Sequence, residues 1–366
     1  MSFDYANFAL KSICPNNRII FDDKEMPSVF VYVPKFRLCD VLSTDDTRIH
    51  PAFVVKGTEI DGFWCGKFQS ICYNERAYSL PGEEPYYWGF PHEWTAYNRA
   101  KGGNFHEITN AEWAAIALWC HKNGTEPYGN NDNGKDSRES VYKAVQKTTN
   151  NGKTELVATG TGPVSWSHDG TLAGIWDLNG NKPEHCNGVR LVKGELQVLK
   201  DNDAAAPDAD LSESSSAWKA IKANATSWSD IYLTPNGSGT TSGSVKLDYI
   251  SNEWVWSTSI SSPTNSTRGG IFKNTTADSS VGNIAKKLLM AQALLPDTSL
   301  TGTGIDADYG NDMFMARNGS AEDGIVLASR GGGYDRQANG GVFCLEMYKG
   351  RTSNPNAGRS AFIGQF

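Results

Sequence analysis

The chain has 366 residues, a length that suits one large domain or two of ordinary size. Its 34 Lys and Arg against 41 Asp and Glu give a net charge of −7, and this acidic balance argues against nucleic acid as the main partner. Charged residues at 20% argue against a disordered acidic tail. No apolar run of about 18 residues is present, which argues against a membrane helix, and no secretory signal pattern is visible in the first residues.

The first part of the chain is predicted to hold a leader and then β-strands. Residues 1–27 are polar and read as an irregular N-terminal leader. β-branched and aromatic residues run from 28 to 33, and similar runs at 51–55 and 62–68 resemble strands. Three strands are therefore expected before the first helix.

Two helices are predicted next, from the residues at their ends. Residues 91–101 begin with proline and stop before two glycines. The helix at 109–123 begins with a capping box, in which the Thr109 oxygen accepts from the Glu112 amide while the Glu112 carboxylate reaches back. Strong helix formers follow, and Asn123-Gly ends the helix.

Regular structure is expected to be sparse after this helix. Ser, Thr and Asn supply 14 of the 25 residues from 257 to 281, which predicts a polar, mobile loop. A third helix is expected at 284–295, capped by Asn283 and stopped by Pro296. From Gly302 onward the chain is rich in glycine, with short apolar pairs. Helices set among short strands and turns indicate an α+β fold.

Cysteine, histidine and acidic residues give weak candidates for chemistry. The seven cysteines include no Cys-x-x-Cys pair, so reduced, mostly buried thiols are expected rather than zinc or a disulfide framework. His185 and Cys186 are adjacent, but neighbours in a strand point to opposite faces, which argues against a catalytic dyad. Two sets of oxygen side chains could suit a hard cation, although solvated turns are the favoured interpretation. The sets are Asp306, Asp308 and Asp312, and Asn130, Asp132 and Asp136.

Two tyrosines stand out because of their surroundings. Tyr334 and Tyr348 lie in a polar, glycine-rich region. Adaptable binding surfaces use tyrosine among small polar residues and glycine, because it offers a large contact area, few rotatable bonds and a hydroxyl. An ordinary loop tyrosine is the alternative interpretation of each.

Three segments carry a resemblance to a known fold. Residues 174–181 (GIWDLNGN), 330–334 (RGGGY) and 357–361 (AGRSA) resemble, in order, motifs of the formylglycine-generating-enzyme type of C-type lectin fold. The blocks at 109–136 and 188–197 resemble one branch more closely, the variable proteins of diversity-generating retroelements found in phages and some bacteria. The resemblance spans about 28–366, with a long insertion at about 195–300 and a variable region at about 310–366.

The resemblance implies a set of variable residues. In that family an error-prone reverse transcriptase rewrites the end of the gene, while the lectin fold holds the changed side chains on a rigid surface. The corresponding positions after the Arg-Gly-Gly-Gly turn are Tyr334, Asp335, Arg336, Gln337 and Asn339, and those of the next strand are Glu346, Tyr348 and Lys349, with Met347 inward. Met313, Met315 and Arg317 are further, more loosely matched positions.

The resemblance also implies a function. It points to a phage tail-tip adhesin, made in the bacterial cytoplasm and carried on the virion, that binds a host-surface protein or glycan, either as a homo-oligomer or as a virion component. A variable protein displayed on the bacterial surface is the alternative. Only Cys344 lies in the last 180 residues, so the copper-binding cysteine pair of the formylglycine-generating enzymes is absent and no enzyme activity is expected. The calcium-binding triplets Glu-Pro-Asn and Gln-Pro-Asp are also absent, so neither a metal nor a cofactor is expected.

Overall fold

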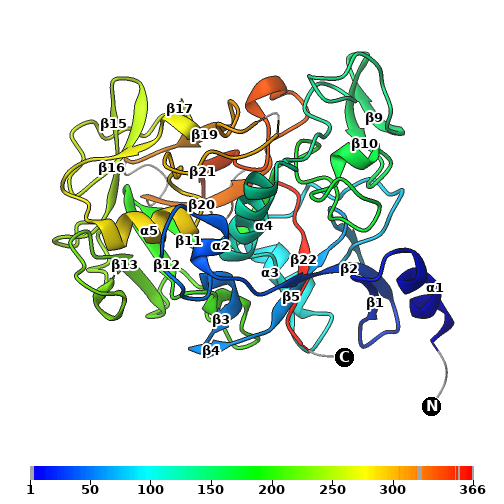
Figure 1. Ribbon diagram of the computed structural model, residues 1–366, viewed down its shortest axis with the longest axis horizontal. Helices are drawn as coiled ribbons and strands as arrows, with labels where there is room; N and C mark the ends of the chain where they lie inside the picture. The colour runs from blue at the N-terminus through cyan, green and yellow to red at the C-terminus, as the bar shows by residue number, and fades with distance from the viewer. Residues whose placement is uncertain (1–3, 305, 320–323, 351, 353–354, 365–366) are drawn as a thin grey trace.

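The computed structural model describes residues 4–304, 306–319, 324–350, 352 and 355–364, and shows a mixed α+β protein made mainly of β-sheet (Figure 1). Its α-helices are α1 (Tyr5–Ile13), α2 (Leu38–Val41), α3 (Pro91–Arg99), α4 (Asn110–Asn123) and α5 (Asn283–Ala291). Among the described residues, no helix is both long and apolar enough to cross a membrane.

The smaller sheet has five strands in the order β1-β2-β5-β22-β8, and every neighbouring pair is antiparallel. The last strand of the chain is inserted between two earlier ones, so both ends of the sequence contribute to this sheet. The strands are β1 (Asn17–Phe21), β2 (Pro27–Pro34), β5 (Gly62–Gly66), β22 (Ser360–Phe362) and β8 (Phe105–Glu107).

The expectation of an irregular leader at 1–27 is wrong for the residues described. α1 and β1 are both regular, and β1 pairs with β2 from Asn17 to Phe21. The side chain of Asn7 joins the two elements, because it donates to Ile19 O at 2.9 Å and accepts from Ile19 N at 2.7 Å. The Asp4 carboxylate caps α1 by accepting from Asn7 N at 3.0 Å.

The larger sheet has 11 strands, and its main path runs β17-β19-β21-β20-β11-β12-β15-β16-β18. Residues 195–300, predicted as an insertion, supply β12 to β18 and α5 and share a hydrophobic core with β20 and β21. The strands are β17 (Arg268–Ile271), β19 (Met313–Ala316), β21 (Leu345–Lys349), β20 (Ile325–Arg330), β11 (Glu184–Val192), β12 (Glu195–Leu199), β15 (Lys246–Ile250), β16 (Glu253–Ser257), β18 (Thr276–Ala277), β13 (Trp218–Ile221) and β14 (Tyr232–Leu233).

Three short hairpins complete the β structure. Each pairs consecutive strands, and the hairpin of β9 and β10 projects at the upper right of Figure 1. The strands are β3 (Val54–Val55), β4 (Thr58–Glu59), β6 (Ile71–Tyr73), β7 (Arg76–Tyr78), β9 (Gln146–Asn150) and β10 (Lys153–Val157).

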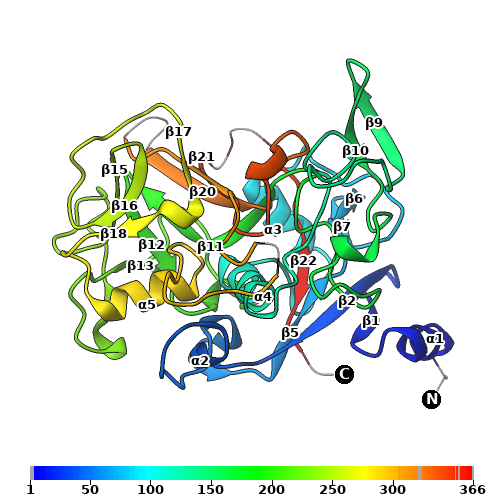
Figure 2. The ribbon, with the colours of Figure 1, turned by 45° about the horizontal axis from the view of Figure 1, so that its top comes forward.

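Helix α4 lies between the two sheets and is seen almost end-on in Figure 2. Its buried side chains share one core cluster with Phe63 of β5 and Cys186 of β11. The predicted capping box is confirmed: Thr109 Oγ1 accepts from Glu112 N at 3.1 Å, and Glu112 Oε2 accepts from Thr109 N at 3.0 Å. Gly124 ends the helix in the left-handed conformation, with φ of 68°.

Three local predictions need correction. Residues 51–55 begin with a 3-10 turn, Pro51–Phe53, because the His50 ring accepts from Ala52 N at 3.2 Å and only Val54–Val55 is a strand. The third helix has Gly282 rather than Asn283 as its N-cap, and it ends at Ala291, before Ala293 adopts a positive φ of 48°. The polar stretch 257–281 contains β17 and β18.

Burial of the Lys101 side chain should make the stability of the protein depend on pH. Lys101 is 1% exposed, donates from Nζ to Ser360 Oγ at 2.9 Å, and burial lowers its pKa to about 7. Between that value and the ordinary lysine pKa of about 10.4, the unfolded chain binds more protons than the folded one, so stability rises with pH in this window. Thermal unfolding should therefore show wild type gaining stability, relative to Lys101→Met, from about pH 7.5 to about pH 9.5.

The matched control is Lys153→Met, which removes an exposed lysine. It should follow wild type across the same pH range. A constant difference in melting temperature between wild type and Lys101→Met would show that Lys101 keeps an ordinary pKa in the folded protein.

Candidate functional site

The motif segments 174–181 and 330–334 meet at a glycine turn that follows β20. Gly331 and Gly332 have φ of 85° and 71°, and a Cβ on Gly331 would lie 2.9 Å from Leu178 O, so this position needs glycine. Gly180 N donates to Gly331 O at 2.9 Å, and Tyr334 N donates to Asn181 O at 3.0 Å. The backbone on either side of Tyr334 is thus held by main-chain bonds that are independent of its side chain.

A cavity of about 570 Å³ opens at this turn, and we call it the site cavity. The turn, the end of β21 and the β9–β10 hairpin border it. Six of the residues predicted from the sequence line it together: Tyr334, Asp335, Arg336, Glu346, Tyr348 and Lys349. Met347, predicted to point inward, is 0% exposed, and that prediction is confirmed.

Glu346 corrects one of these predictions. It was expected to point outward, but it is 1% exposed. Arg336 donates to its Oε1 at 2.7 Å and the Tyr348 hydroxyl donates to its Oε2 at 2.9 Å, so these two side chains cover the carboxylate. Lys349 Nζ lies 3.8 Å from Glu346 Oε2 and donates to Asn356 Oδ1 at 2.8 Å. Glu346 is therefore the buried centre of a charge network rather than an exposed contact residue.

The network changes the acidity of its members. Burial and the neighbouring Glu346 carboxylate raise the pKa of Tyr348 above its ordinary value, so its hydroxyl stays protonated and continues to donate at neutral pH. Burial lowers the pKa of Lys349, while Glu346 opposes that shift. Asp335 is the exposed acidic group among the predicted residues that line the site cavity.

The opposite wall of the site cavity comes from residues that sequence reasoning missed. Trp88 is 60% exposed, and its ring centroid lies 4.8 Å from that of Tyr87. Lys182 Nζ lies 4.5 Å from the centroid of the Tyr87 ring and 4.9 Å from that of Tyr334, and it forms an ion pair with Glu155. The sequence did carry a signal for this wall. Tyr-Tyr-Trp at 86–88 lies between a proline and a glycine, just as Tyr334 lies beside glycines.

The remaining predicted residues lie outside the site cavity. Gln337 and Asn339 form a 3-10 turn, and Gln337 N donates to Asn131 O at 2.7 Å. Met313, Met315 and Arg317 are half-buried and alternate with buried Phe314 and Ala316 along and just beyond β19. Because β19 pairs in parallel with β21, with Met315 opposite Glu346, these three residues extend the same sheet surface beside the cavity.

The candidate cation sites have other structural roles. Asp136 is 0% exposed, and its carboxylate accepts from Gly129 N, Asn131 Nδ2 and Arg138, so it is the centre of a buried polar network. Asp132 is half-buried and forms an ion pair with Lys135. Asp312 is likewise buried and accepts from Phe343 N at 2.7 Å. Among the residues that the structure describes, no group of three or more His, Cys, Asp or Glu is arranged to hold a metal ion.

The adjacent histidine and cysteine also have separate surroundings. His185 Nδ1 lies 3.0 Å from Ser329 Oγ, and burial lowers its pKa to about 3. Cys186 is buried in the core cluster around α4, and burial raises its pKa well above the ordinary value, which disfavours the reactive thiolate. A cysteine–histidine dyad is therefore not formed by these residues.

A scan of the sequence against protein-family models finds no match. A comparison with curated proteins likewise finds no relative with significant similarity.

Proposed function

We propose that this chain is a ligand-binding protein whose binding surface surrounds the site cavity and is diversified by a retroelement. In this proposal the α+β architecture is a C-type lectin fold of the formylglycine-generating-enzyme type, with the segment 195–300 as its long insertion. The protein acts as a phage tail-tip adhesin and binds a protein or glycan on the host surface. It has no catalytic role.

One observation carries the proposal: the six predicted variable residues that line a single cavity come from two separate segments of the chain. A diversified surface needs side chains that can change without disturbing the backbone beneath them. The turn at 330–334 meets this need, because glycines and main-chain hydrogen bonds to Gly180 and Asn181 hold it.

The chemistry of the site cavity suits binding to a macromolecule. Tyrosine, tryptophan and arginine supply most of the energy at protein interfaces, and the cavity has Tyr334, Trp88 and Arg336 on its walls. Charges of both signs line it, so electrostatics would set specificity and association rate more than raw affinity. Display of many copies on a virion would raise avidity by about 10²–10⁴ over one weak contact.

A triple variant tests this surface. Trp88→Ala and Asp335→Ala remove exposed groups of the site cavity, Tyr334→Ala removes a half-buried ring, and all three leave the Glu346 network intact. Binding of fluorescently labelled protein to fixed cells of a strain that retains wild type should weaken by about 100-fold or more, since one interfacial aromatic residue can contribute about 2 kcal/mol. The free energy of unfolding should change by only about 0.5 kcal/mol for each exposed change.

The matched control is Tyr142→Ala with Asp45→Ala, which removes an exposed tyrosine and an exposed aspartate away from the site cavity. This control should bind as wild type does. Unchanged binding by the triple variant would place the binding surface elsewhere and contradict the proposal.

The proposed diversification by a retroelement can be tested by sequencing the genome around this gene. A reverse transcriptase gene and a near-repeat of the coding sequence for 310–366 are expected beside this gene. Differences between the two copies should fall at adenines in the codons of Tyr334 and Asp335, whose side chains lie outside the Glu346 network. Differences concentrated at Gly331 would contradict diversification on a fixed backbone, because a side chain there meets Leu178 O.

A further inference from the structure

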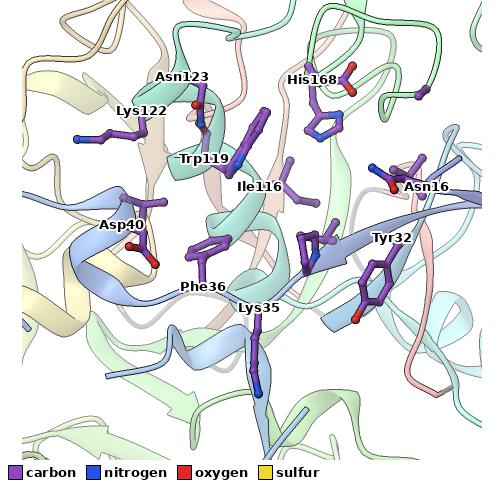
Figure 3. A pocket seen from close by; sticks show the side chains of 16 residues that line it. Asn16, Tyr32, Lys35, Phe36, Asp40, Ile116, Trp119, Lys122, Asn123 and His168 are labelled. Atoms are coloured by element: carbon purple, nitrogen blue, oxygen red, sulfur yellow. The ribbon is translucent and has the colours of Figure 1, made fainter. Parts of the chain in front are cut away.

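A second cavity, of about 480 Å³, lies on another part of the molecule, and we call it the α4 cavity. It is enclosed by β2 and the segment after it, by α2, and by the C-terminal half of α4 (Figure 3). It shares no lining residue with the site cavity, so an inference about it does not depend on the proposed function. Its volume is in the range of small-molecule sites, which is about 300–1,000 Å³.

The walls of the α4 cavity are mainly aromatic and aliphatic. Figure 3 shows Phe36, Ile116 and Trp119 gathered at its centre, while Tyr32 lies at one side. Phe36 and Trp119 are each half-buried, so part of each ring can contact a ligand. These walls favour a planar aromatic ligand, because flat rings pack well against one another in offset or edge-to-face arrangements.

His168 supplies a fixed hydrogen-bond donor to the α4 cavity. His168 N donates to Ile175 O and Ile175 N donates to His168 Nδ1, both at 2.8 Å, so one partner holds the backbone and the ring. Because Nδ1 accepts, the proton of the neutral ring is on Nε2. Burial lowers the pKa of His168 to about 4, which keeps the ring neutral near pH 7. The ring points toward Ile116 in Figure 3, and among the described residues none accepts from Nε2, so this N–H is available to an acceptor of a ligand.

The charged side chains of the α4 cavity favour neither an anion nor a cation. Two acids and two lysines line it, and these are Asp40, Asp169, Lys35 and Lys122. Lys35 Nζ lies 3.0 Å from Asp61 Oδ1, and Asp169 lies close enough to Lys67 to favour the charged form of that lysine. The other two charges are of opposite sign and exposed, where an ion pair contributes little. A charged ligand would lose hydration without gaining a buried counter-ion, so an uncharged ligand is favoured.

We propose that the α4 cavity binds a small, uncharged, planar aromatic molecule that carries a hydrogen-bond acceptor. The ring of the ligand lies against Phe36 and Trp119, and its acceptor receives the Nε2–H of His168. An acid or an amine of the same shape keeps the ring contacts but brings its charge among groups of both signs. The neutral molecule is therefore the tightest ligand of the three.

Calorimetry and ligand-observed NMR with three indoles of similar shape test the preference for a neutral ligand. The probes at neutral pH are indole-3-acetamide, which is uncharged, indole-3-acetate, which is negative, and tryptamine, which is positive. Wild type should bind the amide about threefold or more tightly than either charged probe, because a charge is costly to remove from water. Binding of either charged probe as tightly as the amide, or no binding of the amide, would overturn the proposal.

His168→Asn tests the donor. The Asn carbonyl can replace Nδ1 as the acceptor of Ile175 N, while the Nε2–H is lost. Binding of indole-3-acetamide should weaken by about three- to tenfold, which is the scale of one hydrogen bond. Indole carries no acceptor group, so it controls for the lost ring contact and should bind with little change. Equal losses for the two probes, or no loss for the amide, would contradict donation from His168 to the ligand.

Trp119→Ala tests whether the probes bind in the α4 cavity. It removes one aromatic wall and should weaken indole and indole-3-acetamide alike by about threefold or more, the scale of one contact between rings. The matched control is Tyr73→Ala, which removes an exposed ring outside the cavity and should leave both affinities unchanged. If Trp119→Ala does not fold, the His168→Asn comparison still decides the outcome. Full binding of both probes by a folded Trp119→Ala would place them elsewhere and overturn the proposal.

Discussion

Arg359→Met is expected to reduce the free energy of unfolding by about 3–5 kcal/mol, because it leaves a buried charge without its partner. Arg359 is 0% exposed and donates to both carboxylate oxygens of Glu184, at 2.8 and 2.7 Å. Its remaining N–H groups donate to Gly66 O at 2.9 Å, Trp176 O at 3.0 Å and Asp177 O at 3.2 Å. One side chain therefore joins β5, β11 and the 174–181 segment to the last strand.

The loss in Arg359→Met should grow as pH rises. Burial already raises the pKa of Glu184, and Arg359 opposes that shift by favouring the carboxylate. Without Arg359 the folded protein binds a proton at Glu184 that the unfolded chain releases at lower pH, so stability falls as pH increases. Urea unfolding at about pH 5 and about pH 8 measures this difference.

Arg37→Met is the control for Arg359→Met, because Arg37 is exposed. It should change stability by about 0.5 kcal/mol or less. A loss below about 1 kcal/mol in Arg359→Met would mean that the arginine contributes no more than a surface ion pair does. Glu184→Gln gives an independent measurement, since it removes the charge while keeping an acceptor for Arg359.

The elements predicted best are those whose signals are local. The capping box of Thr109 and Glu112 lies within one helical turn, and both of its hydrogen bonds are present. α1 and β1 were missed because their order depends on contacts across the chain, such as Asn7 with Ile19 and β1 with β2. Local polarity carries no information about such pairing.

The candidate site likewise has parts that local sequence patterns predict and parts that depend on contacts with distant residues. The glycine turn before Tyr334 could be placed from its residues, and the strand alternation put Met347 inward correctly. Burial of Glu346 could not be foreseen, since it depends on Arg336, ten residues away, folding back over the strand. The wall formed by Tyr87 and Trp88 was missed because it reaches the site cavity from a distant part of the sequence.

Glu346→Ala is expected to reduce the free energy of unfolding by about 3–5 kcal/mol, although the family resemblance implies a variable position. The substitution removes the acceptor of two hydrogen bonds, and bonds to charged groups contribute about 1.5–3 kcal/mol each. It also leaves the Arg336 guanidinium, which is only 25% exposed, without its ion-pair partner. Tyr348 and Lys349 lose the group that fixes their positions, so ligand binding should fall as well.

The matched comparison is Asp335→Ala, which removes an exposed acidic group from the same cavity. It should leave the urea midpoint near that of wild type, because surface changes shift stability by only about 0.5 kcal/mol. Glu346→Gln should lie between the two, since the amide keeps one acceptor for Arg336 or Tyr348 but loses the charge. If Glu346→Ala were as stable as Asp335→Ala, Glu346 would tolerate exchange, and the outward position expected from the sequence would describe it better than the buried network does.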